Sequence, residues 1–315
     1  MRPRRRLRRL LLALLMYAAM CSVAGIYLAD STLHPPRRPL TSEDEQNFQR
    51  ALTPFHAQIE DVSITASDGT ILRGWIVRPA EGSGHSALLM HGLGDNRLGM
   101  TGYAQLLLAH GFNVLLPDAR GHGESGGTLV SYGLIERNDI HQWVEMLSAR
   151  TGSRCVYGMG ESMGAAELLQ ALEVDHKFCA VVAESPFANF REIAYDRMGQ
   201  PFHLGPWVGR TVFRPLVEIA FLRARWKYGV NMQSVSPIDA LAKTNIPVLL
   251  IHGKADSNIP VRHSELIVEK DPKIVLWEVP GADHCGAISV APDEFERRVF
   301  DWFSHSTALA TVTSH

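Results

Sequence analysis

The residues that could do chemistry centre on Ser162, which lies in the sequence GESMG at residues 160–164. The apolar run Val156–Gly158 precedes this sequence, and a helical pattern follows it. A serine on such a strand-to-helix turn needs small neighbours two positions to each side, because the turn is strained and the flanking chain passes close. The helix also directs backbone N–H groups at the serine, so we expect the amide of Met163 to bind an oxyanion. The pattern therefore predicts a nucleophilic serine.

A serine nucleophile needs a general base, and the candidate is His284. It lies in the glycine-bounded loop PGADHCG at residues 280–286, after the last apolar run of the chain. Asp256 ends the segment IHGKAD, and we expect its carboxylate to hold the imidazole tautomer and stabilise the imidazolium. Glu184, at the end of an earlier strand, is the alternative acid. Asp283 adjoins His284 in the chain, so we expect it to bond the loop.

A second oxyanion donor is expected from the amide of Leu93. The sequence HGLG at residues 91–94 follows an apolar strand and lies where such a donor is needed. His91 directly precedes this turn. We expect it to be a structural histidine that bonds loop backbone, since a working base must reach the serine hydroxyl.

From Asp61 onward, short apolar runs alternate with longer helical patterns. Strands are predicted at residues 62–65, 71–77, 87–90, 114–116, 156–158, 180–183, 248–252 and 274–279. Helices are predicted at residues 103–109, 136–149, 165–172, 263–269 and 294–303. This alternation predicts an α/β fold in which helices cover both faces of a mostly parallel, eight-stranded sheet. Residues 61–305 would form this domain, and residues 306–315 a C-terminal tail.

Residues 187–233 break the alternation with a mixture of aromatic, apolar and arginine residues. One interpretation is an extra helical pair packed on the core. The other is a helical cap over a binding cleft. Ligands of open α/β sheets bind beyond the carboxyl ends of strands, and this insertion leaves such an end, so we favour the cap.

The N-terminus is predicted to be a membrane anchor. Six arginines precede the uncharged run Leu10–Ala29, which has the length of a bilayer span: Arg2, Arg4, Arg5, Arg6, Arg8 and Arg9. Their position places the N-terminus in the cytoplasm and the domain outside it. The alternative is a signal peptide cleaved near Ala24. The proline-containing residues 31–60 are expected to form an extended stalk.

The overall composition narrows the classes of partner. The net charge of −2 gives no electrostatic reason to expect nucleic acid. The four cysteines lack metal-ligand spacing, so a metal site is not expected. Cys155 and Cys179 head two strands that we expect to be neighbours. An oxidising compartment would permit a disulfide there, but we expect two buried thiols, since neighbouring strands often miss the required geometry.

The segment PDARGHGES at residues 117–125, taken with the motifs around Ser162, Asp256 and His284, resembles the α/β-hydrolase superfamily over residues 61–304. Within it, the chain is most similar to lysophospholipase-like and serine aminopeptidase-like bacterial hydrolases with an N-terminal membrane segment. The resemblance implies a serine triad without a cofactor, acting on an ester, thioester or amide. It also implies that three residues chiefly shape the loop after the fourth strand: Asp118, Arg120 and His122.

The expected reaction is hydrolysis of a carboxylic ester, either a lipid or a small acyl ester. Glu161 departs from the superfamily pattern, because many relatives carry histidine at the position before the nucleophile. Cleavage of an amide or peptide is the alternative reaction, and Glu161 or Glu184 could then bind the charged amine of a peptide. A protein that keeps the fold but only binds is the rival from another class, and the complete set of motifs argues against it.

Overall fold

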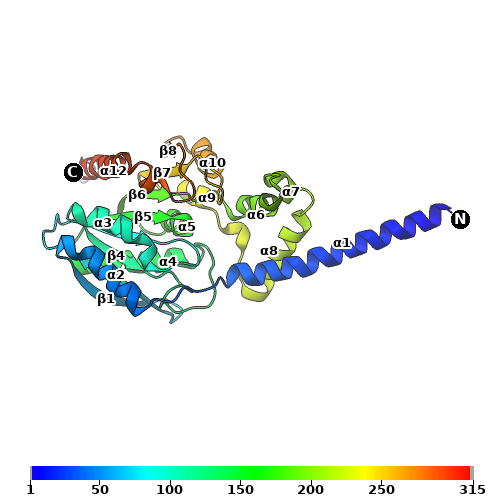
Figure 1. Cartoon of the computed structure of the whole chain (residues 1–315), viewed down its shortest axis with the longest axis horizontal. Coiled ribbons are helices and arrows are strands. Elements are labelled where there is room, and N and C mark those ends of the chain that lie inside the picture. Colours follow the sequence, from blue (N-terminus) through cyan, green and yellow to red (C-terminus); the bar gives the residue numbers. More distant parts are fainter. Residues whose placement is uncertain (1, 313–315) are drawn as a thin grey trace. The chain divides into compact units, whose positions relative to one another are not determined.

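The central element of the computed structural model, which describes residues 2–312, is one eight-stranded sheet (Figure 1). Its strands are β1 (Gln58–Thr65), β2 (Ile71–Arg78), β3 (Ser86–Met90), β4 (Asn113–Pro117), β5 (Val156–Glu161), β6 (Phe178–Glu184), β7 (Val248–Gly253) and β8 (Val275–Val279). Their order in the sheet is β1-β2-β4-β3-β5-β6-β7-β8. All eight predicted strands are present, and the predicted fold class is confirmed.

The pairing of the strands explains their composition. Strand β2 runs antiparallel to both of its neighbours, whereas every pair from β4 to β8 is parallel. Every residue of β3 and β7 is buried, as expected for parallel strands covered on both faces. Strand β1 lies at the edge, and most of its residues are at least partly exposed. The carboxyl ends of the parallel strands lie together at one edge of the sheet.

Helices cover both faces of the sheet. The main core cluster joins one face to α2 (Ser42–Leu52), α3 (Thr101–Ala109) and α12 (Pro292–Val312). On the other face, α4 (Glu136–Thr151) and α5 (Ser162–Ala171) pack together, and α9 (Pro237–Leu241) packs on α5. Two further helices, α10 (Arg262–Lys270) and α11 (Ala287–Val290), contact β8 and β7.

Part of the predicted stalk is wrong, because residues 42–52 form α2 instead of an extended chain. Thr41 begins the helix with a capping box, in which its side chain accepts from the Asp44 amide and the Asp44 carboxylate accepts from the Thr41 amide. Phe48 and Leu52 are buried in the core, and the Phe48 ring stacks on Trp75 with ring centroids 4.9 Å apart. The predicted tail also differs, since α12 continues to Val312.

A second compact unit combines the insertion, Asn189–Val235, with the chain up to His34. The insertion consists of α6 (Phe190–Gly199), α7 (Pro206–Arg210), α8 (Arg214–Tyr228) and short 3-10 turns. The N-terminal helix α1 (Arg2–Leu33) packs along α8 within this unit (Figure 1).

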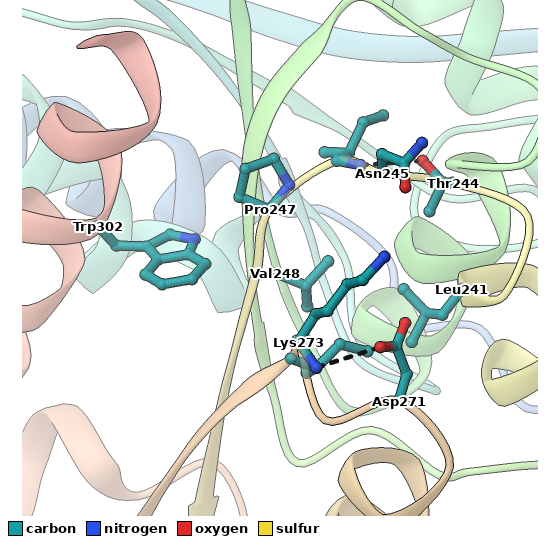
Figure 2. Close-up of a pocket in the computed structure, with 10 residues that line it drawn as sticks. Leu241, Thr244, Asn245, Pro247, Val248, Asp271, Lys273 and Trp302 are labelled. Carbon is teal, nitrogen blue, oxygen red and sulfur yellow. Dashed lines mark hydrogen bonds between the residues drawn. The ribbon is translucent and has the colours of Figure 1, made fainter. Parts of the chain in front are cut away.

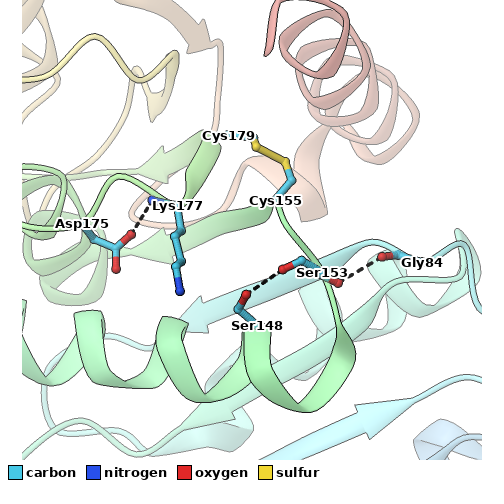
Figure 3. Close-up of a disulfide and its surroundings, with 7 residues drawn as sticks. All are labelled: Gly84, Ser148, Ser153, Cys155, Asp175, Lys177 and Cys179. Atoms are coloured by element: carbon cyan, nitrogen blue, oxygen red, sulfur yellow. Dashed lines mark hydrogen bonds between the residues drawn. A yellow bond between two sulfur atoms is a disulfide. The ribbon is translucent and has the colours of Figure 1, made fainter. Parts of the chain in front are cut away.

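Cys155 and Cys179 are joined by a disulfide, so the expectation of two free thiols is wrong (Figure 3). Their Cα atoms lie 5.5 Å apart. A bulge makes this approach possible, because Val156 pairs with Phe178 while the next pair skips Cys179. Hydrogen bonds fix the segment before β5, where the Ser153 hydroxyl donates to the Gly84 carbonyl over 3.0 Å.

Candidate active site

Ser162 occupies a strained turn between β5 and α5. Its φ of 52° lies in the left-handed region, which a residue with a side chain rarely adopts. Chain segments pass close on both sides, as predicted: a Cβ on Gly160 would lie 2.9 Å from the Ala165 nitrogen, and one on Gly164 would lie 2.4 Å from the Met90 carbonyl oxygen. Glycine is therefore required at both positions, and the serine side chain is held at the carboxyl end of the sheet.

His284 lies between the predicted nucleophile and the predicted acid. Its Nε2 is 2.9 Å from Ser162 Oγ, and its Nδ1 is 2.8 Å from Asp256 Oδ2. Since an ionised carboxylate only accepts, Nδ1 carries the proton and Nε2 is free to accept from the serine hydroxyl. The structure thus brings together three residues separated by 122 and 28 positions along the chain, in the tautomer that a general base needs.

Asp256 is held in its ionised form by several donors. Its Oδ1 accepts from the amides of Asn258 (2.9 Å) and Ile259 (2.8 Å). Burial alone would raise the pKa of this carboxyl, but hydrogen bonds from His252 and His284 and the amide of Ile259 outweigh burial and lower it well below its usual range. Asp256 can therefore fix the orientation of His284 without taking its proton.

His252 supports Asp256 and was missed by sequence reasoning. Its Nε2 lies 2.8 Å from the Ile259 carbonyl oxygen and 3.3 Å from Asp256 Oδ2. Because the carbonyl can only accept, Nε2 carries the proton and donates, while Nδ1 pairs with the Ser264 hydroxyl at 2.7 Å. The signal was present, since His252-Gly253 ends β7 as His91-Gly92 follows β3.

The loop that carries His284 lies directly against the end of β7. A Cβ on Gly253 would lie 2.3 Å from the Ala282 carbonyl oxygen, so a side chain there would displace this loop. Asp283 bonds the loop, as predicted: its Oδ1 accepts from the amides of Ser257 and His284, each over 2.8 Å. Cys285 has a positive φ of 51°. Strained backbone thus occurs on both sides of the Ser162–His284 hydrogen bond.

Glu184, the alternative acid, binds the backbone just after the loop that carries His284. Its Oε2 accepts from the Tyr103 hydroxyl at 2.7 Å, and its Oε1 accepts from the Ala287 amide at 2.9 Å. Burial raises the pKa of Glu184, and these hydrogen bonds only partly oppose the rise. Within residues 2–312, Asp256 is the carboxylate that hydrogen-bonds to the imidazole of His284.

His91 is a structural histidine, as predicted. It is fully buried, its Nε2 accepts from the Ala119 amide at 3.0 Å, and its Nδ1 donates to the Gly92 carbonyl at 2.8 Å. Burial lowers the pKa of its imidazole, which keeps the ring neutral. A Cβ on Gly92 would lie 3.6 Å from Ser162 Cβ, so the turn that continues to Leu93 begins beside the serine. Met163, the other predicted amide donor, is buried in the first turn of α5.

Glu161 lies beside this same turn. Its Oε1 would be 3.4 Å from a Cβ on Gly92. Burial, followed by the charge of Glu184, raises the pKa of Glu161 to about 7. A carboxyl that changes charge near neutral pH therefore stands next to Ser162.

The loop after β4 is built on a buried ion pair. Asp118 accepts from the Arg97 guanidinium at 2.6 Å and from the amides of Arg97 (2.8 Å) and Glu124 (2.7 Å). Arg120 donates to Asp139 and Asp68. His122 is buried, its Nδ1 lies 2.9 Å from the Arg120 carbonyl oxygen, and burial lowers its pKa to about 4. These contacts tie the loop to Arg97, to α4 and to the turn between β1 and β2, which fits the expected shaping role.

Two other features could suggest a ligand, and both lie outside the Ser162 site. A pocket of about 190 Å³ borders the amino end of β7, with Val248 and Trp302 in its wall, whereas Ser162 follows a carboxyl end (Figure 2). The ligand atoms of His141, Glu145 and Asp175 lie within 4.8 Å of one another. Ion pairs account for this group, because Glu145 binds Lys177 and His141 binds Asp175.

The chain is similar to known hydrolases and their relatives in both sequence and structure. A sequence model of the alpha/beta hydrolase family matches residues 87–298. The uncharacterized protein YqkD of Bacillus subtilis is 34% identical over 213 residues, 66% of each chain. YfhR of Escherichia coli, also uncharacterized, is 31% identical over 73% of this chain and 75% of its own. The structure of the Pyrococcus furiosus esterase Pf2001 superposes with a TM-score of 0.66 at 26% identity, covering 87% of this chain and 97% of that one.

Proposed function

The chain belongs to the alpha/beta hydrolase family, and from that premise we propose that it is a serine esterase with Ser162 as its nucleophile. The observation that carries the proposal is the chain of two hydrogen bonds from Ser162 through His284 to Asp256, at 2.9 and 2.8 Å. These two linked hydrogen bonds activate a serine hydroxyl that is otherwise a weak nucleophile.

The reaction has two steps. Ser162 Oγ attacks the ester carbonyl while His284 Nε2 takes the hydroxyl proton, and the amides of Leu93 and Met163 donate to the oxyanion. The C–O bond to the alcohol breaks, and His284 returns the proton to the departing oxygen. Water, deprotonated by His284, then attacks the acyl-enzyme, and the acid leaves as Ser162 regains its proton. Every group in this cycle comes from the chain and water.

A carboxylic ester is the proposed substrate class, either a lipid or a small acyl ester. Pf2001 is named an esterase and supports this choice. The lysophospholipase-like resemblance of the sequence points the same way. Amide cleavage is the second candidate, since Glu161 places a carboxyl beside the site that could bind an amine. We further propose that the insertion at residues 187–233 selects the acyl group, because it follows the carboxyl end of β6.

The N-terminal helix is proposed to be an uncleaved, single-pass anchor, with the catalytic domain outside the cytoplasm. The apolar run lies within one helix, Arg4–Leu33, long enough to span a bilayer. Cleavage near Ala24 would remove Cys21, which is fully buried in the contact with the insertion. The Cys155–Cys179 disulfide is typical of an oxidising compartment and supports an extracytoplasmic domain. Secretion after cleavage is the alternative.

Labelling with a fluorophosphonate tests the proposed nucleophile, because the probe reacts only with an activated serine. The expected result is one labelled peptide containing Ser162, and loss of both the label and ester hydrolysis in Ser162→Ala. Ser185→Ala is a matched control, since Ser185 follows β6 with a positive φ of 51° as Ser162 follows β5. Labelling that persists in Ser162→Ala would refute the assignment, and labelling without ester hydrolysis would favour the amide alternative.

A further inference from the structure

We propose that α1 and the insertion contact the membrane as one unit, with the exposed flank of α8 lying in the lipid headgroup region. This inference rests on the proposed anchoring by α1 and names a second lipid-binding surface. The surface consists of Leu222 and Trp226, whose side chains are 66% and 82% exposed. Its proposed occupant is a bilayer that contains anionic lipid.

The first step is the contact between α1 and α8. The buried residues of α1 recur at every fourth position and so form one face of the helix: Cys21, Gly25, Ala29 and Leu33. A Cβ on Gly25 would lie 2.7 Å from the Leu216 carbonyl oxygen and 2.9 Å from Ile219 Cγ2, so the two backbones are in close contact there. Glycine permits this approach, as it does between helices inside membranes.

The second step is the direction of α8 along α1. Tyr17 contacts Val212 near the start of α8, and Asp30 contacts residues near its end. The Asp30 carboxylate lies 3.2 Å from Arg223 Nε and 3.3 Å from Lys227 Nζ, and it accepts from the Tyr228 hydroxyl at 2.9 Å. The contacts advance in the same sense on both helices, so α8 runs parallel to the second half of α1.

The third step places Leu222 and Trp226 relative to the apolar run. Both lie beyond Ile219, which meets Gly25, so they flank the last turns of α1. The uncharged run ends at Ala29, and Asp30 follows it. If this run spans a bilayer, its end marks the outer interface, and the two exposed side chains stand at that level. Tryptophan is enriched at this depth, where its ring is partly apolar and its N–H remains wet.

The charges of α8 fit the same placement. In its last turns, Arg223 and Lys227 pair with Asp30, and Arg225 is an exposed cation, which suits attraction to anionic headgroups. Closer to the middle of the apolar run, Glu218 is paired: it accepts from Arg191 and lies 3.9 Å from Arg214 Nε. Paired charges are the form in which ionisable groups occur at membrane depth. Within α8, the large exposed apolar side chains are Leu222 and Trp226, and contact with lipid would explain their exposure.

Quenching of tryptophan fluorescence by brominated lipid tests the proposal. The full chain is reconstituted in vesicles of phosphatidylglycerol and phosphatidylcholine brominated near the headgroup. Trp226→Phe should remove a large part of the quenching seen with the unaltered chain. Trp277→Phe is the matched control and should leave the quenching unchanged, because Trp277 lies on β8 beneath Arg298, whose guanidinium carbon is 4.9 Å from its ring.

Equal quenching in Trp226→Phe and the unaltered chain would overturn the proposal, provided circular dichroism shows both folded. The mass of the reconstituted chain separates this failure from that of the anchor. A chain that begins near Gly25 has lost its anchor and overturns both ideas. A chain that retains residues 2–24 but shows no contribution from Trp226 overturns only the contact with α8. Hydrolysis of a soluble ester, measured in the same samples, reports independently on Ser162.

Discussion

Asp256 and Glu184 follow neighbouring strands, β7 and β6, and both reach the loop that carries His284. Both carboxyl groups are buried, and burial by itself raises the pKa of each. The outcome differs, because the pKa of Asp256 is lowered and that of Glu184 is raised. Asp256 receives two backbone amides and two imidazoles, whereas Glu184 receives one phenol and one amide.

The difference teaches that the donors around a carboxyl decide its function more than its place at a strand end. Four donors keep Asp256 ionised, so it can stabilise an imidazolium during the reaction. Glu184 has fewer donors, so burial outweighs them and its pKa is raised. Its two oxygens accept from Tyr103 and Ala287, which makes it a structural link between them. In the sequence, the segment IHGKAD favours Asp256, and the donors around each carboxyl give the physical reason for the difference.

The substitution with the largest expected effect is Asp256→Asn. The amide would favour a proton on His284 Nε2, the nitrogen that must accept from Ser162, so the base would hold the wrong tautomer. We expect kcat to fall by about 10⁴ on an activated, soluble ester, as in the best-studied triad. The measurement is kcat with circular dichroism as the check on folding.

Asp283→Asn is the control for this variant, because it makes the same chemical change in the loop that carries His284. Asparagine retains an oxygen that can accept from the Ser257 and His284 amides, so its loss of kcat should be far smaller. If the two variants lost activity equally, the effect would belong to the loop and the comparison with Glu184 would lose its basis.

Glu184→Gln should have a smaller effect, a fall in kcat of less than about tenfold. Glutamine can present its oxygen to the Ala287 amide and its NH₂ to the Tyr103 oxygen.

The raised pKa of Glu184 also makes the free energy of unfolding depend on pH. The unfolded chain releases this proton at lower pH than the folded chain, so the wild type loses stability relative to Glu184→Gln as pH rises above about 4.3.

Midpoints of thermal unfolding at several pH values measure the effect on stability. The effect on activity is measured as kcat on the same ester. The variant should gain in relative thermal stability with rising pH. A collapse of kcat in Glu184→Gln, with most activity kept in Asp256→Asn, would instead assign the triad acid to β6.

Most of the fold could be predicted, because apolar runs bounded by turn residues mark buried strands wherever they occur. The helix α2 was missed since prolines dominated the composition around it. Its capping residues, Thr41 and Asp44, were the signal that could have found it. The disulfide needs the bulge that skips Cys179 in the pairing of β5 with β6, and no local pattern predicts that register.

The residues brought together at the site were predicted from chemistry that local motifs express: a strained turn, a glycine-bounded loop and an acid after a strand. Their supports were harder to find. Tyr103 lies 81 residues from Glu184 in the chain, and nothing near it in the sequence distinguishes it from a core residue. The pKa of Glu161 depends on the burial of its carboxyl and on the nearby charge of Glu184, and both arise only in the folded chain.

Glu161 extends the comparison to a third carboxyl, whose effect should be the smallest. Its pKa of about 7 means that it is mostly neutral below neutral pH and mostly ionised above it. An ionised Glu161 would place negative charge beside the turn that carries Gly92, next to the position where the oxyanion develops. Like charges disfavour that transition state, so the wild type should lose part of its kcat/KM as Glu161 ionises.

Glu161→Gln should remove this loss, and the ratio of kcat/KM in the variant to that in the wild type should rise by a few-fold, less than about tenfold, as pH passes through about 7. The ratio cancels the titration of groups that both enzymes share. Glu265→Gln, at an exposed position on α10, controls for the change in net charge and should give a flat ratio. If the ratio for Glu161→Gln is also flat between about pH 5 and 9, the charge of Glu161 does not reach the oxyanion, and only Asp256 among the three carboxyls acts on the reaction electrostatically.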